Sequence, residues 1–216
     1  NHPLGKNLIG SFYRPRWVWI DEQYLRTLPP RQLRSGWVEA LKHGLIMDSA
    51  FFELASEIVG RDSFTESPNS LAWMPIIKRA IEIKATIVRE DELEENLRGL
   101  LNLGHTMGHA IEKTKSELFH GEAVALGLSF TVDYATRYHD LPLEDGEKIK
   151  AVLAQAGFES EWRDYISDRT MEFLEFDKKR AGQDLKFVIL SAIGIATIET
   201  VDVNLFKERV FKLMAL

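Results

Sequence analysis

The sequence contains no cysteine, which excludes both disulfide bonds and zinc sites built from thiolates. Any metal ion must therefore be held by histidine, aspartate or glutamate side chains. A chain without cysteine also suits a reducing compartment, so we expect a cytoplasmic protein. Long hydrophobic runs are missing too, since segments such as Phe187–Leu190 are far shorter than the roughly 20 residues of a membrane-spanning helix. We expect no membrane partner.

Positive charge is also in the minority. The 27 lysines and arginines are outnumbered by 33 acidic residues, for a net charge of −6, and no basic stripe stands out. This balance argues against a nucleic-acid partner but permits a local cationic pocket for a small anion. No signal peptide is visible, and the chain begins with Asn1 rather than methionine. We therefore expect a fragment of a longer protein.

The residues that are present predict a mainly α fold. Residues 1–15 are rich in glycine and proline, which is typical of loops, and Arg16–Ile20 is a short β-prone run. Pro30 suits the first turn of a helix. From there to about residue 175 the pattern is mostly helical.

The end of the chain predicts a different element. Leu185–Leu190 and Ile195–Thr200 flank a turn at Ser191–Gly194, which indicates a β-hairpin. Asn204–Leu216 then predicts a closing helix. The expected fold is thus a multi-helix C-terminal domain with a short N-terminal strand segment and a small late β-hairpin.

One predicted helix carries a charged residue among apolar ones. Met74–Arg89 places Ile77, Ile81 and Val88 on one face. Lys84 falls in the middle of this stripe. A lysine in such a place usually extends its ammonium group into solvent, but it can also present a cation to a ligand.

The densest cluster of chemically capable side chains spans Arg98–Glu112. Within it, His105 and His109 are one helical turn apart, so their imidazoles share one face of a helix. His120 follows at the start of the next predicted helix. On spacing alone, such a histidine pair is more often an ordinary surface or core pair than a metal site.

Several features occur together and favour a functional site over ordinary surface or core residues. Four of the six histidines lie beside glycines, where the backbone can approach a ligand: His43, His105, His109 and His120. Cations recur near the same segments, namely Lys42, Lys84 and Arg98. The residues alone therefore predict a His/Glu metal enzyme that acts on an anion.

Six blocks of the sequence, in order, resemble 3-dehydroquinate synthases. They are Asn1–Gly10, Thr27–Pro29, Gly36–Lys42, the signature block Asp91–His109, His120–Val124 and Asp177–Lys179. The resemblance covers nearly the whole chain. It implies that residues 1–29 are a linker and remnant of an NAD-binding domain, and that residues 30–216 form a helical domain for metal and substrate.

The family's chemistry supplies further expectations. Its members are carbon–oxygen lyases of the shikimate pathway of aromatic amino acid biosynthesis. They use zinc (or cobalt) and catalytic NAD to cyclise the sugar phosphate 3-deoxy-D-arabino-heptulosonate 7-phosphate to 3-dehydroquinate, with loss of phosphate. We expect a homodimer as the full-length enzyme. We expect no activity from the fragment alone, because the glycine-rich half that cradles NAD is not in these 216 residues.

The resemblance also implies roles for single residues. The implied metal ligands are Glu39, His105 and His120, so the pair one helical turn apart would not chelate together. His109 would face the substrate phosphate, with Asn102 and Lys178 near the same end. Lys179 is the alternative to Lys178.

Other implied roles concern the rest of the substrate and the cofactor. Lys84 and Arg98 would meet the substrate carboxylate, which a planar guanidinium binds with two parallel hydrogen bonds. Lys42 and Glu94 would line the pocket. Asn7 would approach the substrate. The residues that would approach NAD are Lys6, Thr27 and Leu28.

Rival interpretations stay open at this point. A related sugar-phosphate cyclase or a metal-dependent polyol dehydrogenase could share the scaffold, although Arg98, Asn102 and Lys178 together favour a substrate with both carboxylate and phosphate. A zinc hydrolase is less suitable because no general-base glutamate lies between His105 and His109. The chain could also be a non-catalytic structural fragment.

Overall fold

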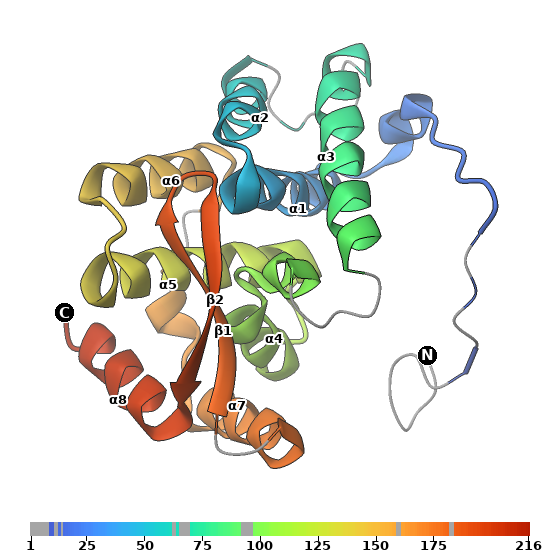
Figure 1. The fold of residues 1–216 in the computed structure, drawn as a ribbon. Helices are drawn as coiled ribbons and strands as arrows, with labels where there is room; N and C mark the ends of the chain where they lie inside the picture. Colours follow the sequence, from blue (N-terminus) through green and yellow to red (C-terminus); the bar gives the residue numbers. More distant parts are fainter. Residues whose placement is uncertain are drawn as a thin grey trace.

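The computed structural model describes residues 9–10, 13, 15–61, 64, 70–91, 97–158, 161–181 and 184–216. It is mainly helical with one late hairpin, which confirms the predicted fold class (Figure 1). The elements are η1 (Glu22–Thr27), α1 (Pro30–Met47), α2 (Ser49–Arg61), α3 (Ser70–Glu90), η2 (Leu97–Asn102), α4 (His105–Thr114), α5 (His120–Tyr138), α6 (Leu143–Gln155), η3 (Trp162–Tyr165), α7 (Asp168–Ala181), β1 (Asp184–Ala192), β2 (Ile195–Asp202) and α8 (Val203–Met214).

Helix α5 lies between two hydrophobic cores. Through Leu128 and Val132 it packs into a core built with α1, α2, α3 and α6. Through Phe130 and Tyr134 it packs into a second core built with α4, α7 and α8. Most of its residues are buried between the two cores, which fits the central position of α5 in Figure 1.

The hairpin joins the same two cores. Strands β1 and β2 pair antiparallel, with Val188 opposite Ile198. Because successive side chains of a strand point to opposite faces, Val188 and Leu190 of β1 enter the first core. Phe187 and Ile189 enter the second. The predicted hairpin is confirmed.

The crossing of α4 and α5 is unusually close. Gly104 precedes α4 with φ +76, a left-handed conformation that suits glycine. A Cβ atom at Gly127 of α5 would collide with the carbonyl oxygen of Gly104, and one at Gly108 would lie 2.9 Å from the carbonyl oxygen of Ala123. The two backbones therefore touch at positions where only hydrogen fits.

The N-terminal strand prediction was wrong. Arg16–Ile20 has no regular secondary structure, and Trp17 and Trp19 are 88% and 89% exposed. A β-prone run forms a strand only when it has a neighbour to pair with. Within the described part of the chain, the sheet consists of β1 and β2.

Helix α3 differs from its prediction in two details. It begins at Ser70, before the predicted start at Met74, and it includes Pro75. Its buried face is centred on Ile76, Ile83 and Ile87, while Ile81 is 41% exposed. Lys84 is therefore exposed at the edge of the apolar stripe rather than in its middle.

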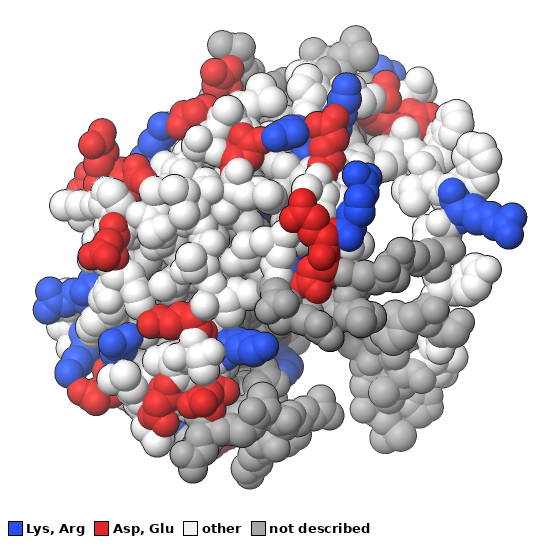
Figure 2. All heavy atoms as spheres, viewed as in Figure 1, with Lys and Arg blue, Asp and Glu red and all other residues white. Residues whose placement is uncertain are grey.

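The surface is mixed in charge. Acidic and basic side chains are interspersed over the described part of the face in Figure 2, so neither sign forms a broad band there. Among the described residues, no helix is long and apolar enough to cross a membrane.

Candidate metal centre and cationic cavity

A cavity of about 440 Å³ opens where α1, α3, η2, α4 and the start of α5 meet. It collects seven of the residues singled out from the sequence: Glu39, Lys42, Lys84, Arg98, Asn102, His105 and His120. His43, Val88 and Leu101 complete its lining. His109 lies next to it, with its ring centroid 5.0 Å from that of His105.

Three side chains converge at one point of this cavity. Oε1 of Glu39 lies 3.4 Å from Nε2 of His105 and 3.2 Å from Nε2 of His120. Each comes from a different helix, since Glu39 is in α1, His105 begins α4 and His120 begins α5. The close crossing of α4 and α5 sets the two imidazoles side by side, with ring centroids 5.2 Å apart.

These distances fit a shared ion. Ligand atoms about 2.0–2.1 Å from a tetrahedral zinc ion lie roughly 3.3–3.4 Å from each other. Glu39 Oε1 is buried and accepts no hydrogen bond within the described structure. A buried carboxylate oxygen without a donor is costly unless it is otherwise compensated, and a cation between the two Nε2 atoms would compensate it.

A second grouping shares two of these residues. Nitrogen atoms of His105, His109 and His120 all lie within 4.8 Å of one another. Both groupings could hold a divalent cation. In the grouping with Glu39, the distances between ligand atoms are closer to those around a tetrahedral zinc ion, and the carboxylate supplies a negative charge. We favour Glu39 over His109 as the third ligand for these two reasons.

The other nitrogen of each imidazole has a partner that orients the ring. Nδ1 of His105 lies 3.1 Å from the carbonyl oxygen of Leu103, and Nδ1 of His120 lies 3.3 Å from Oε2 of Glu112. These partners are acceptors, and the ammonium group of Lys42, which also lies near His105 Nδ1, is farther away at 3.4 Å. Each Nδ1 is therefore assigned the proton, and each Nε2 keeps its lone pair for a metal.

Lys42 fixes the position of the Glu39 carboxylate. Its ammonium group is 2.8 Å from Glu39 Oε2 and donates to the carbonyl oxygen of Leu101 at 2.6 Å. Burial opposes the charge of Glu39, but the ammonium group of Lys42, joined by the two imidazoles when they are protonated, outweighs burial and lowers the pKa of Glu39. The carboxylate is thus ionised, with one oxygen held by Lys42 and the other turned toward the histidines.

The rest of the cavity is cationic. Lys42, Lys84 and Arg98 face a single carboxylate, Glu39, among the lining residues. Burial, and then nearby Lys42, lower the pKa of His105 to about 4. The imidazole is therefore neutral at neutral pH and available as a ligand. Such a site can bind a metal ion and an organic anion next to each other.

Some predicted residues lie elsewhere. Lys6, Asn7 and Glu94 fall outside the described residues, and Lys178 lies in α7 with its side chain outside them. The exposed Thr27 donates to the carbonyl oxygen of Tyr24 at 3.0 Å. Leu28 lines a separate apolar cavity of about 280 Å³ between η1, α1 and α3, which shares Glu39 and His43 with the first.

Two residues of the site received no role from the sequence. Glu112 orients His120, and its only sequence signal is its place at the end of the histidine-rich block. His43 is buried, lines both cavities, and has no hydrogen-bond partner for Nδ1 within the described structure. Its neighbour Gly44 is visible in the sequence, but nothing there indicates burial.

The helical fold and this cavity define a class: a domain with a candidate divalent-cation site beside a cationic pocket that suits an anion. A family model described as 3-dehydroquinate synthase C-terminal matches residues 36–180, and one described as 3-dehydroquinate synthase N-terminal matches residues 1–35. The chain belongs to the 3-dehydroquinate synthase C-terminal family.

Curated relatives give the same result. The chain is 39% identical over 198 residues to the 3-dehydroquinate synthase of Bordetella pertussis, covering 91% of this chain and 54% of that protein. It is 40% identical over 212 residues to that of Lysinibacillus sphaericus, covering 96% of this chain and 57% of that protein. The chain thus spans little more than half the length of these relatives.

Solved structures of two synthases share the fold. A 2-deoxy-scyllo-inosose synthase, crystallised with carbaglucose-6-phosphate, NAD+ and Co2+, has a TM-score of 0.80 and 27% identity, covering 98% of this chain and 60% of that one. A 2-epi-5-epi-valiolone synthase from Streptomyces hygroscopicus, with NAD+ and Zn2+ bound, has a TM-score of 0.79 at 22% identity, covering 96% and 58%. The second likeness concerns the fold alone.

Proposed function

We propose that this chain is the metal- and substrate-binding part of a 3-dehydroquinate synthase, a carbon–oxygen lyase that cyclises 3-deoxy-D-arabino-heptulosonate 7-phosphate. The observation that carries the proposal is the convergence of Glu39 Oε1 on Nε2 of His105 and of His120. Zn2+ or Co2+ and NAD are the proposed cofactors, in line with the ligands of the solved 2-deoxy-scyllo-inosose synthase.

In this proposal the bound metal supplies Lewis-acid polarisation of a substrate oxygen and NAD supplies reversible hydride exchange. The protein's own residues bind and orient the substrate. Arg98 and Lys84 hold the carboxylate, because a guanidinium fork matches a planar carboxylate. Asn102 and His109, with Lys178, hold the phosphate, and Lys42 keeps Glu39 ionised and in place.

The rest of the enzyme is part of the proposal. Because the chain spans little more than half of its curated relatives, the remaining half would supply most of the NAD-binding surface, with Lys6, Asn7, Thr27 and Leu28 at its edge. We propose a homodimer for the full-length enzyme.

The test separates metal binding from turnover. We expect this chain alone to bind Co2+ with visible d–d absorption typical of low coordination, yet to show no release of phosphate from the substrate when NAD is added. The full-length enzyme should turn over. Failure of the chain to bind Co2+ would remove the basis of the proposal, and turnover by the chain alone would contradict the requirement for the other half.

The expected effect of Arg98→Ala in the full-length enzyme is a loss of kcat/KM of about ten- to hundredfold, which is the range for losing a hydrogen bond to a charged group. The metal content should not change, since the proposed ligands are Glu39, His105 and His120 rather than Arg98. Steady-state kinetics and elemental analysis measure the two quantities. A variant that loses its metal would show that Arg98 acts on the metal site rather than on the substrate.

A related sugar-phosphate cyclase is the second candidate, favoured by the fold shared with the solved 2-deoxy-scyllo-inosose synthase. The two candidates differ in the group that Arg98 meets. A substrate with both carboxylate and phosphate should be preferred over a sugar phosphate without a carboxylate, and the opposite preference would favour the second candidate.

Glu112 provides a test of the metal site that does not depend on turnover. Glu112→Ala should weaken Co2+ or Zn2+ binding by about 10–100-fold, the usual effect of losing an outer-shell partner of a ligating histidine. The reason is that His120 Nδ1 would lose the acceptor 3.3 Å away that orients its ring. Competition with a chromophoric chelator measures the affinity, and Glu112→Gln should recover part of it.

A matched control comes from another histidine–carboxylate pair. His139 Nε2 lies 3.1 Å from Glu199 Oε2, and neither residue lines the cationic cavity. Glu199→Ala should leave metal affinity unchanged. Equal affinities for Glu112→Ala and wild type would show that Glu112 has no role in positioning His120.

A further inference from the structure

A third, smaller cavity lies between α1, the start of α5 and the segment after α6. It holds about 150 Å³, which is room for about five water molecules at liquid density. None of its lining residues lines the cationic cavity. It is therefore a separate site, and its ligand does not depend on the proposed function.

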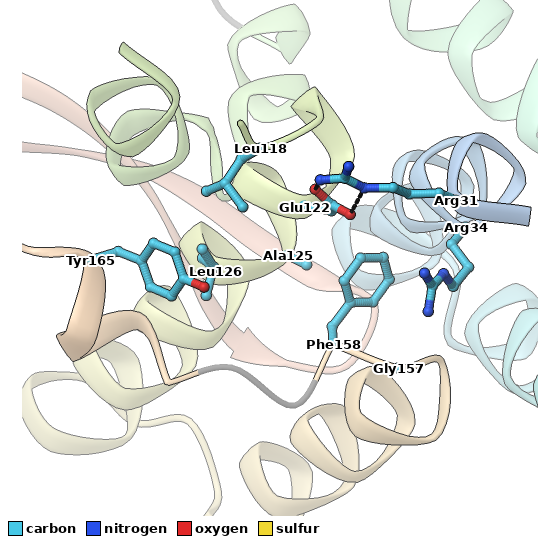
Figure 3. Close-up of a pocket in the computed structure, with 9 residues that line it drawn as sticks. All are labelled: Arg31, Arg34, Leu118, Glu122, Ala125, Leu126, Gly157, Phe158 and Tyr165. Atoms are coloured by element: carbon cyan, nitrogen blue, oxygen red, sulfur yellow. Dashed lines mark hydrogen bonds and ion pairs between the residues drawn. The ribbon is translucent and has the colours of Figure 1, made fainter. Parts of the chain in front are cut away.

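One ion pair closes the upper wall of this cavity in Figure 3. Arg31 donates to both oxygens of Glu122 at 2.5 and 2.6 Å and to the carbonyl oxygen of Glu117 at 2.8 Å. Glu122 also accepts from the backbone N–H of Phe119 at 2.8 Å, which secures the start of α5. Nε and Nη2 of Arg31 and both oxygens of Glu122 are thus already engaged.

Arg34 differs from Arg31. Its half-buried guanidinium lines the cavity but makes no hydrogen bond or ion pair within the described structure. It lies against Gly157, where an added Cβ would be 2.6 Å from Nη1. Gly157 comes just after α6, whose terminal carbonyls attract a cation. Arg34 thus lies beside the end of α6. Its charge adds to that of Arg31 in lowering the pKa of Glu122 against the effect of burial, while its N–H donors have no acceptor within the described structure.

The remaining lining residues suit the flat, apolar part of a small ligand. In Figure 3, Arg34 and Tyr165 lie at opposite sides of the cavity, with Leu126 and Phe158 between them. The Tyr165 hydroxyl points toward Leu126 and has no hydrogen-bond partner within the described structure. Aromatic and aliphatic walls with one polar group at each end are typical of a small-ligand site.

The charge of the lining limits the ligand to a monoanion. Arg31 and Arg34 together outnumber Glu122 by one charge. A dianion such as phosphate would face a single available guanidinium and a nearby carboxylate. A carboxylate matches the planar fork of Arg34. We propose that this cavity binds a small aryl carboxylate, with its carboxylate on Arg34, its ring against Phe158 and Leu126, and its far edge at Tyr165.

The experiment is a titration of the full chain with benzoate, 4-hydroxybenzoate and inorganic phosphate, monitored by calorimetry or by NMR chemical shifts. We expect saturable binding of benzoate and weaker binding of phosphate. Arg34→Gln should weaken benzoate binding by about ten- to hundredfold. Arg34→Lys, which keeps the charge near α6 but lacks the fork, should fall between Arg34→Gln and wild type. Tyr165→Phe should affect 4-hydroxybenzoate more than benzoate.

The matched control is Arg98→Gln, because Arg98 is the arginine of the other cavity. Benzoate binding that survives Arg34→Gln, or that is lost in Arg98→Gln instead, overturns the proposal. Phosphate binding as tight as benzoate binding overturns the assigned ligand class. Unchanged thermal unfolding of Arg34→Gln and Arg34→Lys establishes that lost binding is not lost folding.

Discussion

Glu39→Gln should release the bound metal, whereas His109→Ala should retain it. Glutamine keeps the size of the side chain but removes the negative charge that faces the two Nε2 atoms at 3.4 and 3.2 Å. The loss of affinity should exceed the roughly 10–100-fold typical of an outer-shell change, and His105→Ala and His120→Ala should match it. Equilibrium dialysis with Zn2+ and the visible spectrum with Co2+ measure the effect.

The two variants separate the two possible ligand sets. If His109 is the third ligand, His109→Ala should lose the ion and Glu39→Gln should keep it, which is consistent with the three imidazoles lying within 4.8 Å of one another. Thermal unfolding of each metal-free variant controls for general damage. Retention of the metal by Glu39→Gln would contradict our choice of ligands.

The second large effect concerns acid stability of the metal-free chain. Burial, and then the nearby Lys42 and Lys84, lower the pKa of His43 from 6.5 to about 4. Between these two values the unfolded chain binds more protons than the folded chain, so the free energy of unfolding falls as the pH falls. A shift of this size corresponds to about 3 kcal/mol, present above about pH 6.5 and lost by about pH 4.

His43→Phe should remove that part of the pH dependence. Phenylalanine does not titrate, and it replaces a buried ring whose Nδ1 has no partner within the described structure, so stability near neutral pH should be kept or raised. Urea unfolding near pH 7 and near pH 4 measures the change. His109→Phe, at an exposed position, serves as the control. A His43→Phe variant as acid-sensitive as wild type would contradict the burial argument.

The parts of the fold that depend on local pattern were predictable from sequence. The hairpin followed from two β-prone runs around a turn, and α1 from Pro30 at its first turn. The buried face of α3 was not predictable, because isoleucines occupy several neighbouring faces and only packing selects Ile76, Ile83 and Ile87. The strand predicted at Arg16–Ile20 was wrong for a similar reason, since a β-prone segment forms a strand only beside a partner strand.

The site divides in the same way. The His105 and His109 spacing indicated a possible metal site, and both rings do lie together. The approach of Glu39, far away in the chain, has no local signal and came only from the resemblance to a family. Glu112 reaches His120 across the turn between α4 and α5, and helical periodicity does not extend across such a turn.

The close crossing of α4 and α5 has a consequence for variation in this protein. Gly104, Gly108 and Gly127 bear no functional group, yet they determine how near the first residues of the two helices can come. A single methyl group at Gly127 would collide with the backbone of Gly104. The two helices would have to move apart, and His105 and His120 would separate with them. Screens for inactivating substitutions should therefore find that these glycines tolerate replacement as poorly as the proposed metal ligands do.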